Sequence, residues 1–427
     1  MDGAFTTRPE LGGTFGMVSS THWLATQCGM AVLESGGNAF DAAVAAGFVL
    51  QVVEPHLNGL GGEVPVVLWD VSRGRVEVIC GQGPAPEAAS IDRVTAMGVD
   101  EIPGTGLLAA CVPGAFAGWM TLLRDHGTRR LEDVLRFAID YAEAGYPIVP
   151  RIADVIGAVE ELFRAHWPTS AALYLRDGVP RAGRRFRNPD LAGTYSRVLA
   201  EAFAQGGGRE RQIEGALGAF YCGFVAEAID KHSRNDAMDS SGTPHPGLLT
   251  GADLANFKAA HEQAVAVDFA GWTVAKCGAW SQGPTFLQQL RLLEGFDLAG
   301  AGSCPPITST PWSSAQSWRS RTARPGTGIP RSSTWISSCC WIAAMRVRAA
   351  IWLVSERPSS FGRGRSTERC RACLNVANSQ SPKAIGRAPA LMGSAKCGAT
   401  RFTSPSLIVR ATWSHARRAE AGCRAPL

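Results

Sequence analysis

Residues 33–56 read LESGGNAFDAAVAAGFVLQVVEPH, and this stretch decides the fold. Asn38 can cap a helix, and Asp41 in the first turn of that helix favours the helix dipole. The residues that follow are apolar on almost every face of the helix until Pro55 ends it. A helix of this kind must be buried, and its small alanines allow a neighbouring layer to approach closely.

The same periodicities predict the neighbouring elements. A helix over residues 22–35 precedes the buried one and stops at Gly36 and Gly37. Long buried helices flanking strands predict a layered α/β or α+β sandwich. The further predicted elements are helices over 114–126, 131–144, 189–205, 212–231 and 284–295, a hairpin of Val64–Trp69 with Val76–Cys80, and a hairpin of Ala264–Phe269 with Trp272–Ala275.

A glycine cluster follows the buried helix, in HLNGLGGEVP at residues 56–65. Gly59, Gly61 and Gly62 permit a positive φ or a close approach of the backbone to a ligand, so they are candidate substrate-binding residues. The alternative is a tight turn into the next strand.

The composition changes at about Gly302. Residues 1–302 hold 23 Lys and Arg against 34 Asp and Glu, whereas residues 303–427 hold 19 against 3. The second part also carries seven of the twelve cysteines and half of the tryptophans. The chain therefore divides into a body, residues 1–302, and a basic tail, residues 303–427.

Several classes of function lack support in the body. No stretch of 18 uncharged apolar residues is present, so we predict no membrane span. The N-terminal residues lack a basic start and an apolar run, which favours a cytoplasmic location. No phosphate-binding loop, nucleophile elbow or paired-cysteine zinc spacing occurs, so no cofactor and no metal are predicted. The scattered body cysteines are expected to be buried thiols: Cys28, Cys80, Cys111, Cys222 and Cys277. The histidines His56, His126 and His245 are expected to be isolated.

Taken together, several body segments resemble the γ-glutamyltransferase (γ-glutamyltranspeptidase) family. The run GGNAFDAAVA is the most specific of them, and the others follow in family order over nearly all of the body. They are GMVSSTHWLAT at 16–26, LESGGNAFDAAVAAGFVLQVVEPH at 33–56, GLGGEVP at 59–65, GTGLLAACVPGAFAGW at 104–119, FYCGFVAEAI at 220–229, LTGADLANF at 249–257 and QQLRLLEGFDL at 288–298.

The resemblance implies a four-layer αββα fold of the N-terminal-nucleophile hydrolase type, incomplete in this chain. Such proteins are made as one precursor that cleaves itself. The N-terminal Thr of the new small subunit then transfers a γ-glutamyl or related acyl group from a small-molecule amide, with its own α-amine as base. The family's catalytic half lies C-terminal to the segments matched here, where this chain has its basic tail. No catalytic residue is therefore assigned.

One body position departs from the family pattern. Typical members carry an Arg that clamps the α-carboxylate of the substrate in a short Asp-Phe-Arg-Glu stretch, where this chain reads CGQGPAP at residues 80–86. Gln82 stands in place of that Arg, and a neutral amide cannot supply a bidentate charged clamp. This favours a related acylase or amidase specificity. The alternative is that Gln82 is an ordinary loop residue and the clamp comes from elsewhere.

The tail carries family sequence in a neighbouring reading frame. When translation starts at the third base of each codon, SRTARPGTGIPR at 320–331 permits ADREAWYGDPE, and GATRFTSPSLIVRATW at 398–413 permits GDTVHLAVVDRAGNMV. Both readings use one offset and keep the family's motif order. We therefore predict a frameshift near residues 300–303, with the nucleophilic Thr of GDTVH encoded across Thr400 and Arg401.

Other interpretations of the tail are weaker. Cys370 and Cys373 have the spacing of half a zinc site, but no second pair follows. The basic residues form no stripe that would indicate nucleic-acid binding. We expect a disordered tail, an inactive polypeptide as written and no nucleic-acid or membrane partner. Oligomeric state, acyl donor and acceptor stay open, and a non-catalytic binding protein is the alternative.

Overall fold

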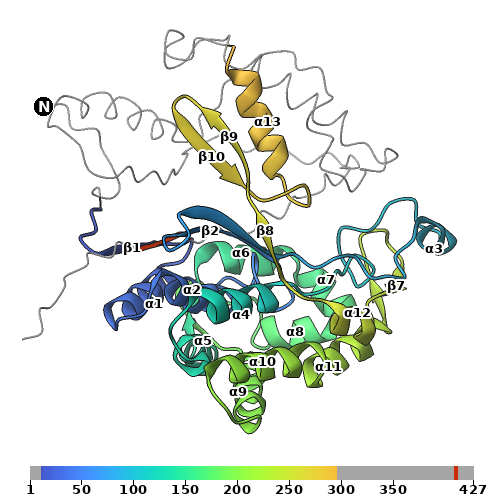
Figure 1. The fold of residues 1–427 in the computed structure, drawn as a ribbon. Coiled ribbons are helices and arrows are strands. Elements are labelled where there is room, and N and C mark those ends of the chain that lie inside the picture. Colours follow the sequence, from blue (N-terminus) through green and yellow to red (C-terminus); the bar gives the residue numbers. More distant parts are fainter. Residues whose placement is uncertain (1–10, 296–407, 412–427) are drawn as a thin grey trace, which may run out of the picture. The chain divides into compact units, whose positions relative to one another are not determined.

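The structure, a computed structural model, describes residues 11–295 and 408–411. These residues fall into two compact units. The helical unit contains residues 11–65, 79–260 and 408–411, and the small unit contains residues 66–78 and 261–295. Both units combine helices with strands, which confirms the predicted α/β class (Figure 1).

The described helices and strands follow the predicted order closely. The helices are α1 (Trp23–Glu34), α2 (Ala39–Val53), α3 (Ile91–Ala96), α4 (Ala115–His126), α5 (Leu131–Ala144), α6 (Pro150–Ala158), α7 (Glu160–His166), α8 (Pro168–Tyr174), α9 (Pro189–Ala204), α10 (Arg209–Tyr221), α11 (Phe224–Ser233), α12 (Gly251–Asn256) and α13 (Gly283–Leu293). The strands are β1 (Gly16–Ser19), β2 (Val64–Asp70), β3 (Arg75–Gly81), β4 (Tyr146–Pro147), β5 (Arg185–Phe186), β6 (Asp236–Met238), β7 (Pro244–Pro246), β8 (Ala260–Gln263), β9 (Val265–Phe269), β10 (Trp272–Lys276) and β11 (Ile408–Ala411).

Helix α2 is the centre of the helical unit. It packs against α1, α4 and α5, and twelve of its fifteen residues are buried. Phe48 lies on its inner face, with ring centroids 5.9 Å from Phe116 and 5.6 Å from Tyr195. Gly47 is needed for the approach of α4, because a Cβ there would lie 2.4 Å from the ring of Trp119. The predicted burial of this helix and its close contact with a neighbouring layer are confirmed.

The N-terminus of α2 is capped as its sequence predicts. The Asn38 side chain accepts from the backbone N–H groups of Phe40 and Asp41, and Asp41 Oδ2 accepts from Asn38 N at 2.9 Å. This reciprocal pair is a capping box. Asn38 also donates from Nδ2 to the His126 carbonyl at 2.7 Å, which joins this cap to the C-terminus of α4.

Asp41 has a second role that the sequence pattern did not predict. Its carboxylate is fully buried and accepts from Thr128 N at 2.8 Å, Thr128 Oγ1 at 2.7 Å and Arg129 N at 2.9 Å. These donors lie in the connection between α4 and α5. Asp41 thus fixes one helix cap and one distant loop with the same carboxylate.

The small unit is built on the predicted hairpin of β9 and β10. The turn at Ala270 and Gly271 uses positive φ angles of 50° and 82°, and Val274 on β10 contributes to a core with Leu287 and Leu290 of α13. The predicted pairing of β2 with β3 is also confirmed, in a sheet of order β2-β3-β8. Gly74 makes its turn with a φ of 62°.

Two expectations about the fold need correction. The predicted helix over 212–231 is two helices, α10 and α11, because the chain breaks at Cys222 and Gly223. A Cβ at Gly223 would lie 2.8 Å from the Ala219 carbonyl oxygen, so this break relies on glycine. The prediction that all five body cysteines are buried is wrong for Cys111 and Cys222, which are exposed, and for Cys80, which is half-buried.

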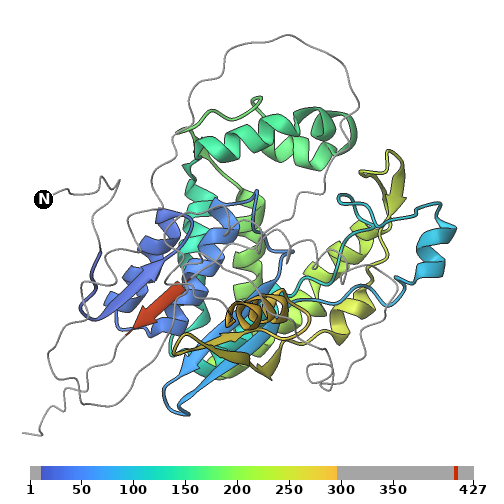
Figure 2. The same cartoon turned by 90° about the horizontal axis from the view of Figure 1, so that it is seen from above.

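Strand β1 pairs antiparallel with β11, whose register sets Gly16 opposite Ala411. Figure 2 shows the two strands side by side. Apart from β11, the tail lies outside the described residues, and so do Cys370, Cys373, Thr400 and Arg401. Among the helices of the described part, none has the length and apolar character required to cross a membrane.

Candidate active-site region at the start of helix α4

The predicted glycine cluster forms a turn after α2. Gly62 N donates to the Gly59 carbonyl at 3.0 Å, and the Asn58 side chain accepts from Gly59 N at 2.8 Å. None of Gly59, Gly61 and Gly62 is among the residues with positive φ, so the positive φ that glycine permits is not used at these positions. The turn itself is confirmed.

This turn is fixed to the beginning of α4. The Gly62 carbonyl accepts from Gly114 N at 3.0 Å and from Ala115 N at 2.9 Å. The Tyr221 hydroxyl accepts from Ala117 N at 3.1 Å and donates to the Pro113 carbonyl at 2.7 Å. Several of the N–H groups that a helix leaves unpaired at its N-terminus are therefore occupied here by the protein. Tyr221 is a positioning residue that the sequence pattern did not reveal.

The segment that carries Gln82 reaches the same place. Val112 N donates to the Pro84 carbonyl at 3.0 Å, and a Cβ on Gly83 would lie only 1.7 Å from the Val112 carbonyl oxygen. A Cβ on Gly114 would lie 2.3 Å from the Gly81 carbonyl oxygen. The glycines at 81, 83 and 114 thus allow three backbone segments to touch. The close approach of glycines 59, 61 and 62 to a ligand stays a prediction.

The structure brings Gln82 and Gly62 to one junction, which we call the α4 junction: residues 59–63, 81–84 and 111–115. Gln82 is half-buried, and its carbonyl accepts from Cys80 Sγ at 4.0 Å. Although Cys111 is exposed as a residue, its thiol is partly desolvated by the surrounding protein. This desolvation and, to a smaller extent, the nearby Glu63 carboxylate raise the pKa of the thiol. The thiol therefore stays protonated at neutral pH and is a poor nucleophile.

A buried polar group precedes this junction, between the start of α1 and the end of α2. His22 Nδ1 accepts from Leu24 N at 3.2 Å, so the neutral ring carries its proton on Nε2. Thr21 Oγ1 donates to Glu54 Oε2 at 2.5 Å. Burial, with a smaller contribution from His56, lowers the pKa of His22 to about 4. Burial, and then Arg151, lowers the pKa of His56.

His22 should make the protein sensitive to acid. In the unfolded chain the imidazole binds a proton at its ordinary pKa of 6.5, whereas in the folded protein it does so only at about 4. Stability is therefore lost as the pH falls from 6.5 towards 4, by about 2 kcal/mol between pH 8 and pH 5. His22→Asn keeps a cap acceptor without a titrating group. Denaturant unfolding at pH 8 and pH 5 measures how much unfolding free energy is lost between the two pH values. This loss should be about 2 kcal/mol smaller in His22→Asn than in the unsubstituted protein, and an equal loss in both would contradict the pKa assigned to His22.

The junction holds and orients a chain segment, and the described residues include no nucleophile paired with a base there. The predicted nucleophilic Thr is encoded across Thr400 and Arg401, which lie outside the described residues. The chemistry that the junction can supply is limited to the Gln82 amide, the Glu63 carboxylate and backbone groups. These groups can bind and orient a substrate.

Comparisons with known proteins identify the family. The sequence model of γ-glutamyltranspeptidase matches residues 25–310. The glutathione hydrolase-like YwrD proenzyme of Bacillus subtilis (strain 168) is 34% identical over 289 residues, which cover 67% of this chain and 50% of the relative. The acylase ACY 1 proenzyme of Pseudomonas sp. (strain V22) is 32% identical over 305 residues, with coverage of 68% and 50%.

Solved structures give the same result. LmbA2991HD matches with a TM-score of 0.66 and 55% identity, over 68% of this chain and 50% of that one. The γ-glutamyltranspeptidase of Helicobacter pylori matches with a TM-score of 0.63 and 29% identity, over 74% and 85%. The chain spans about half the length of the curated relatives it matches. The matched fold is that of the N-terminal-nucleophile hydrolases, and this chain belongs to the γ-glutamyltranspeptidase family.

Proposed function

We propose that residues 1–302 are the large-subunit part of an enzyme that cleaves a small-molecule amide through a Thr acyl-enzyme. In this proposal the reading frame changes near residues 300–303, and the small subunit with its nucleophile is encoded in the shifted frame. The polypeptide as written is then inactive and does not cleave itself. The runs ADREAWYGDPE and GDTVHLAVVDRAGNMV, read at one offset, support the shift.

Gln82 carries the proposal on specificity. It lies at the α4 junction beside Gly81 and Gly83, whose close contacts with Val112 and Gly114 hold the loop in place. A neutral amide there gives no charged clamp for a substrate carboxylate. We therefore assign an acylase or amidase specificity for substrates without the γ-glutamyl α-carboxylate, in line with the similarity to the acylase ACY 1 proenzyme.

A second candidate is γ-glutamyl hydrolysis with the carboxylate clamp supplied by another residue. The 34% identity to the glutathione hydrolase-like relative favours it. The two candidates differ in one measurable property, the effect of an Arg at position 82. With either specificity, glycines 59, 61 and 62 would contribute backbone contacts to the substrate. The cytoplasmic location of the protein stays a prediction.

Sequencing genomic DNA across the codons for residues 295–305 tests the frame. We expect a one-base correction that joins the two frames, and an intact frame giving the tail as written would refute the shift. The corrected protein should mature into two subunits, whereas the chain as written should stay whole and release no p-nitroaniline from a γ-glutamyl anilide.

In the corrected protein, Gln82→Arg tests the specificity. An added guanidinium can bind a carboxylate with two charge-assisted hydrogen bonds, so we expect kcat/KM for the γ-glutamyl anilide to rise about tenfold or more. Gln205→Arg, at an exposed position after α9, is the control and should leave kcat/KM unchanged. High γ-glutamyl activity before the substitution, with no gain after it, would favour the second candidate.

A further inference from the structure

The β6–β7 hairpin contains a hydrogen-bonded series of side chains that the proposed function does not use. His245 on β7 lies with its Nδ1 2.7 Å from Asp239 Oδ2, and its Nε2 lies 3.4 Å from Thr243 Oγ1. Asp239 and His245 are buried, whereas Thr243 is exposed. The prediction that His245 is isolated is therefore wrong.

The proton positions in this series follow from its partners. An ionised carboxylate has no proton, so His245 Nδ1–H is the donor to Asp239, and in the neutral imidazole Nε2 then carries a lone pair. Burial alone would raise the pKa of the Asp239 carboxyl, but hydrogen bonds from Ser241 and His245 outweigh burial and lower this pKa. The carboxylate is thus ionised at neutral pH, and the imidazole lone pair faces the Thr243 hydroxyl.

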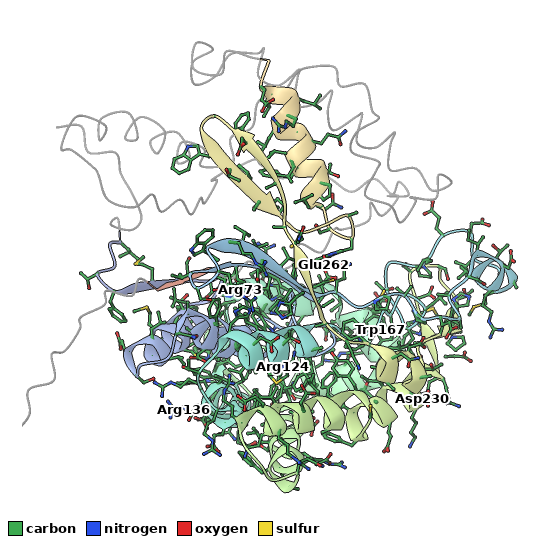
Figure 3. The ribbon with its side chains drawn as sticks, in the orientation of Figure 1. Arg73, Arg124, Arg136, Trp167, Asp230 and Glu262 are labelled. Carbon is green, nitrogen blue, oxygen red and sulfur yellow. The ribbon has the colours of Figure 1, made fainter. Side chains whose placement is uncertain are left out.

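The surrounding contacts hold this geometry. The Trp167 ring N–H, labelled in Figure 3, donates to the Met238 carbonyl at 2.9 Å. Ser240 Oγ accepts from Gly104 N at 2.8 Å. A Cβ on Gly106 would lie 2.6 Å from Asp239 Cβ, so the loop before α4 packs directly on the hairpin. The strand end and turn that carry Asp239 are therefore held by contacts from outside the hairpin.

We propose that Thr243 is an acyl-accepting nucleophile, with His245 as its general base and Asp239 as the residue that positions the imidazole. The acyl donor is an activated aryl ester. Thr243 Oγ1 attacks the ester carbonyl carbon and forms the new C–O bond, while the bond from that carbon to the aryl oxygen breaks. The Thr243 proton passes to His245 Nε2 and then to the departing phenolate. The product is an acylated Thr243.

Ser241 competes for the Thr243 proton. Ser241 Oγ donates its one proton to Asp239 Oδ1 at 2.6 Å, so in its 2.8 Å contact with Thr243 it must be the acceptor. That contact is shorter than the 3.4 Å separation between Thr243 and His245. Removing the Ser241 hydroxyl should therefore direct the Thr243 proton to the imidazole and speed acylation. A site with a merely structural network would show no such gain.

The test is acetylation of the full chain by p-nitrophenyl acetate, with each modified residue located and timed by peptide mass spectrometry. Thr243 should be acetylated at least tenfold faster than Thr250 and Thr273. Those two hydroxyls each donate to a carboxylate at 2.6 Å, to Asp253 and Asp268, and neither is hydrogen-bonded to an imidazole of the described residues. Equal rates at the three threonines would overturn the proposal.

Variants separate the roles. Thr243→Val should lose the acetylation at this site, His245→Asn should slow it about a hundredfold, and Ser241→Ala should speed it severalfold. A slower or unchanged rate in Ser241→Ala would overturn the proton assignment and with it the proposal. His245→Asn can disturb the hairpin, so Asp239→Asn is the second variant. In Asp239→Asn the ¹⁵N chemical shifts of the His245 ring should show that the proton has moved from Nδ1 to Nε2. Acetylation of Thr243 should be at least tenfold slower in the same variant.

Discussion

Replacing Asp41 with Asn should lower the free energy of unfolding by about 3–5 kcal/mol. The Asp41 carboxylate is fully buried, and both of its oxygens are acceptors. Oδ1 accepts hydrogen bonds from Thr128 N and Arg129 N. Oδ2 accepts hydrogen bonds from Asn38 N and Thr128 Oγ1. An Asn side chain has one oxygen and one NH₂ group. Whichever way it turns, the NH₂ faces backbone donors, so buried donors are left without an acceptor.

Urea unfolding of the full chain, followed by tryptophan fluorescence, measures this effect. Asp190→Asn is the matched control, because Asp190 also lies in the first turn of a helix, α9, but is exposed. It should cost less than about 1 kcal/mol, which is the size of a surface interaction with the helix dipole. Similar losses in the two variants would show that the contacts of Asp41 with Thr128 and Arg129 add nothing to stability.

Gly83→Ala should destabilise the protein by about 3 kcal/mol or more, the second large effect that we expect. The added Cβ would lie 1.7 Å from the Val112 carbonyl oxygen and 2.6 Å from the carbonyl carbon. These are backbone atoms, and the Val112 N–H is itself bonded to the Pro84 carbonyl. No side-chain rotation can therefore relieve the contact, and the two segments must separate.

Gly61→Ala is the control for that variant. Gly61 belongs to the same α4 junction, yet an added Cβ would meet no atom within 4 Å, and its φ is not positive. The substitution should change the unfolding free energy by less than about 0.5 kcal/mol, or stabilise slightly by reducing the entropy of the unfolded chain. A large loss in Gly61→Ala, or none in Gly83→Ala, would contradict the backbone contacts described for the junction.

The parts of the fold that could be predicted are those whose causes are local. The Asn38 cap, the buried run of α2 and the turns at Gly74 and Gly271 depend on residues within a few positions of one another. The break at Gly223 was missed although its cause is also local, because the close approach of the Ala219 carbonyl, four positions earlier, leaves no mark in the apolar pattern. Periodicity continues across such a break.

The candidate site shows the same limit more strongly. Gln82 and Gly62 were singled out by a family resemblance and by composition, but their meeting at α4 depends on glycines 81, 83 and 114, which no pattern marked. Tyr221 lies 104 residues from Ala117, whose N–H it accepts. His245 was expected to be isolated because its partner Asp239 lies on the other side of a turn, and only the hairpin pairing brings them together.

The double role of Asp41 also affects the order in which the helical unit can fold. Its bond to Asn38 N forms as soon as the first turn of α2 exists, whereas its bonds to Thr128 must wait for a loop of 87 residues to close. Closing a loop of this length costs entropy before any contact repays it. Until then the carboxylate must remain hydrated, so α2 cannot be fully buried. Burial of α2 and arrival of the α4–α5 connection are therefore one kinetic event.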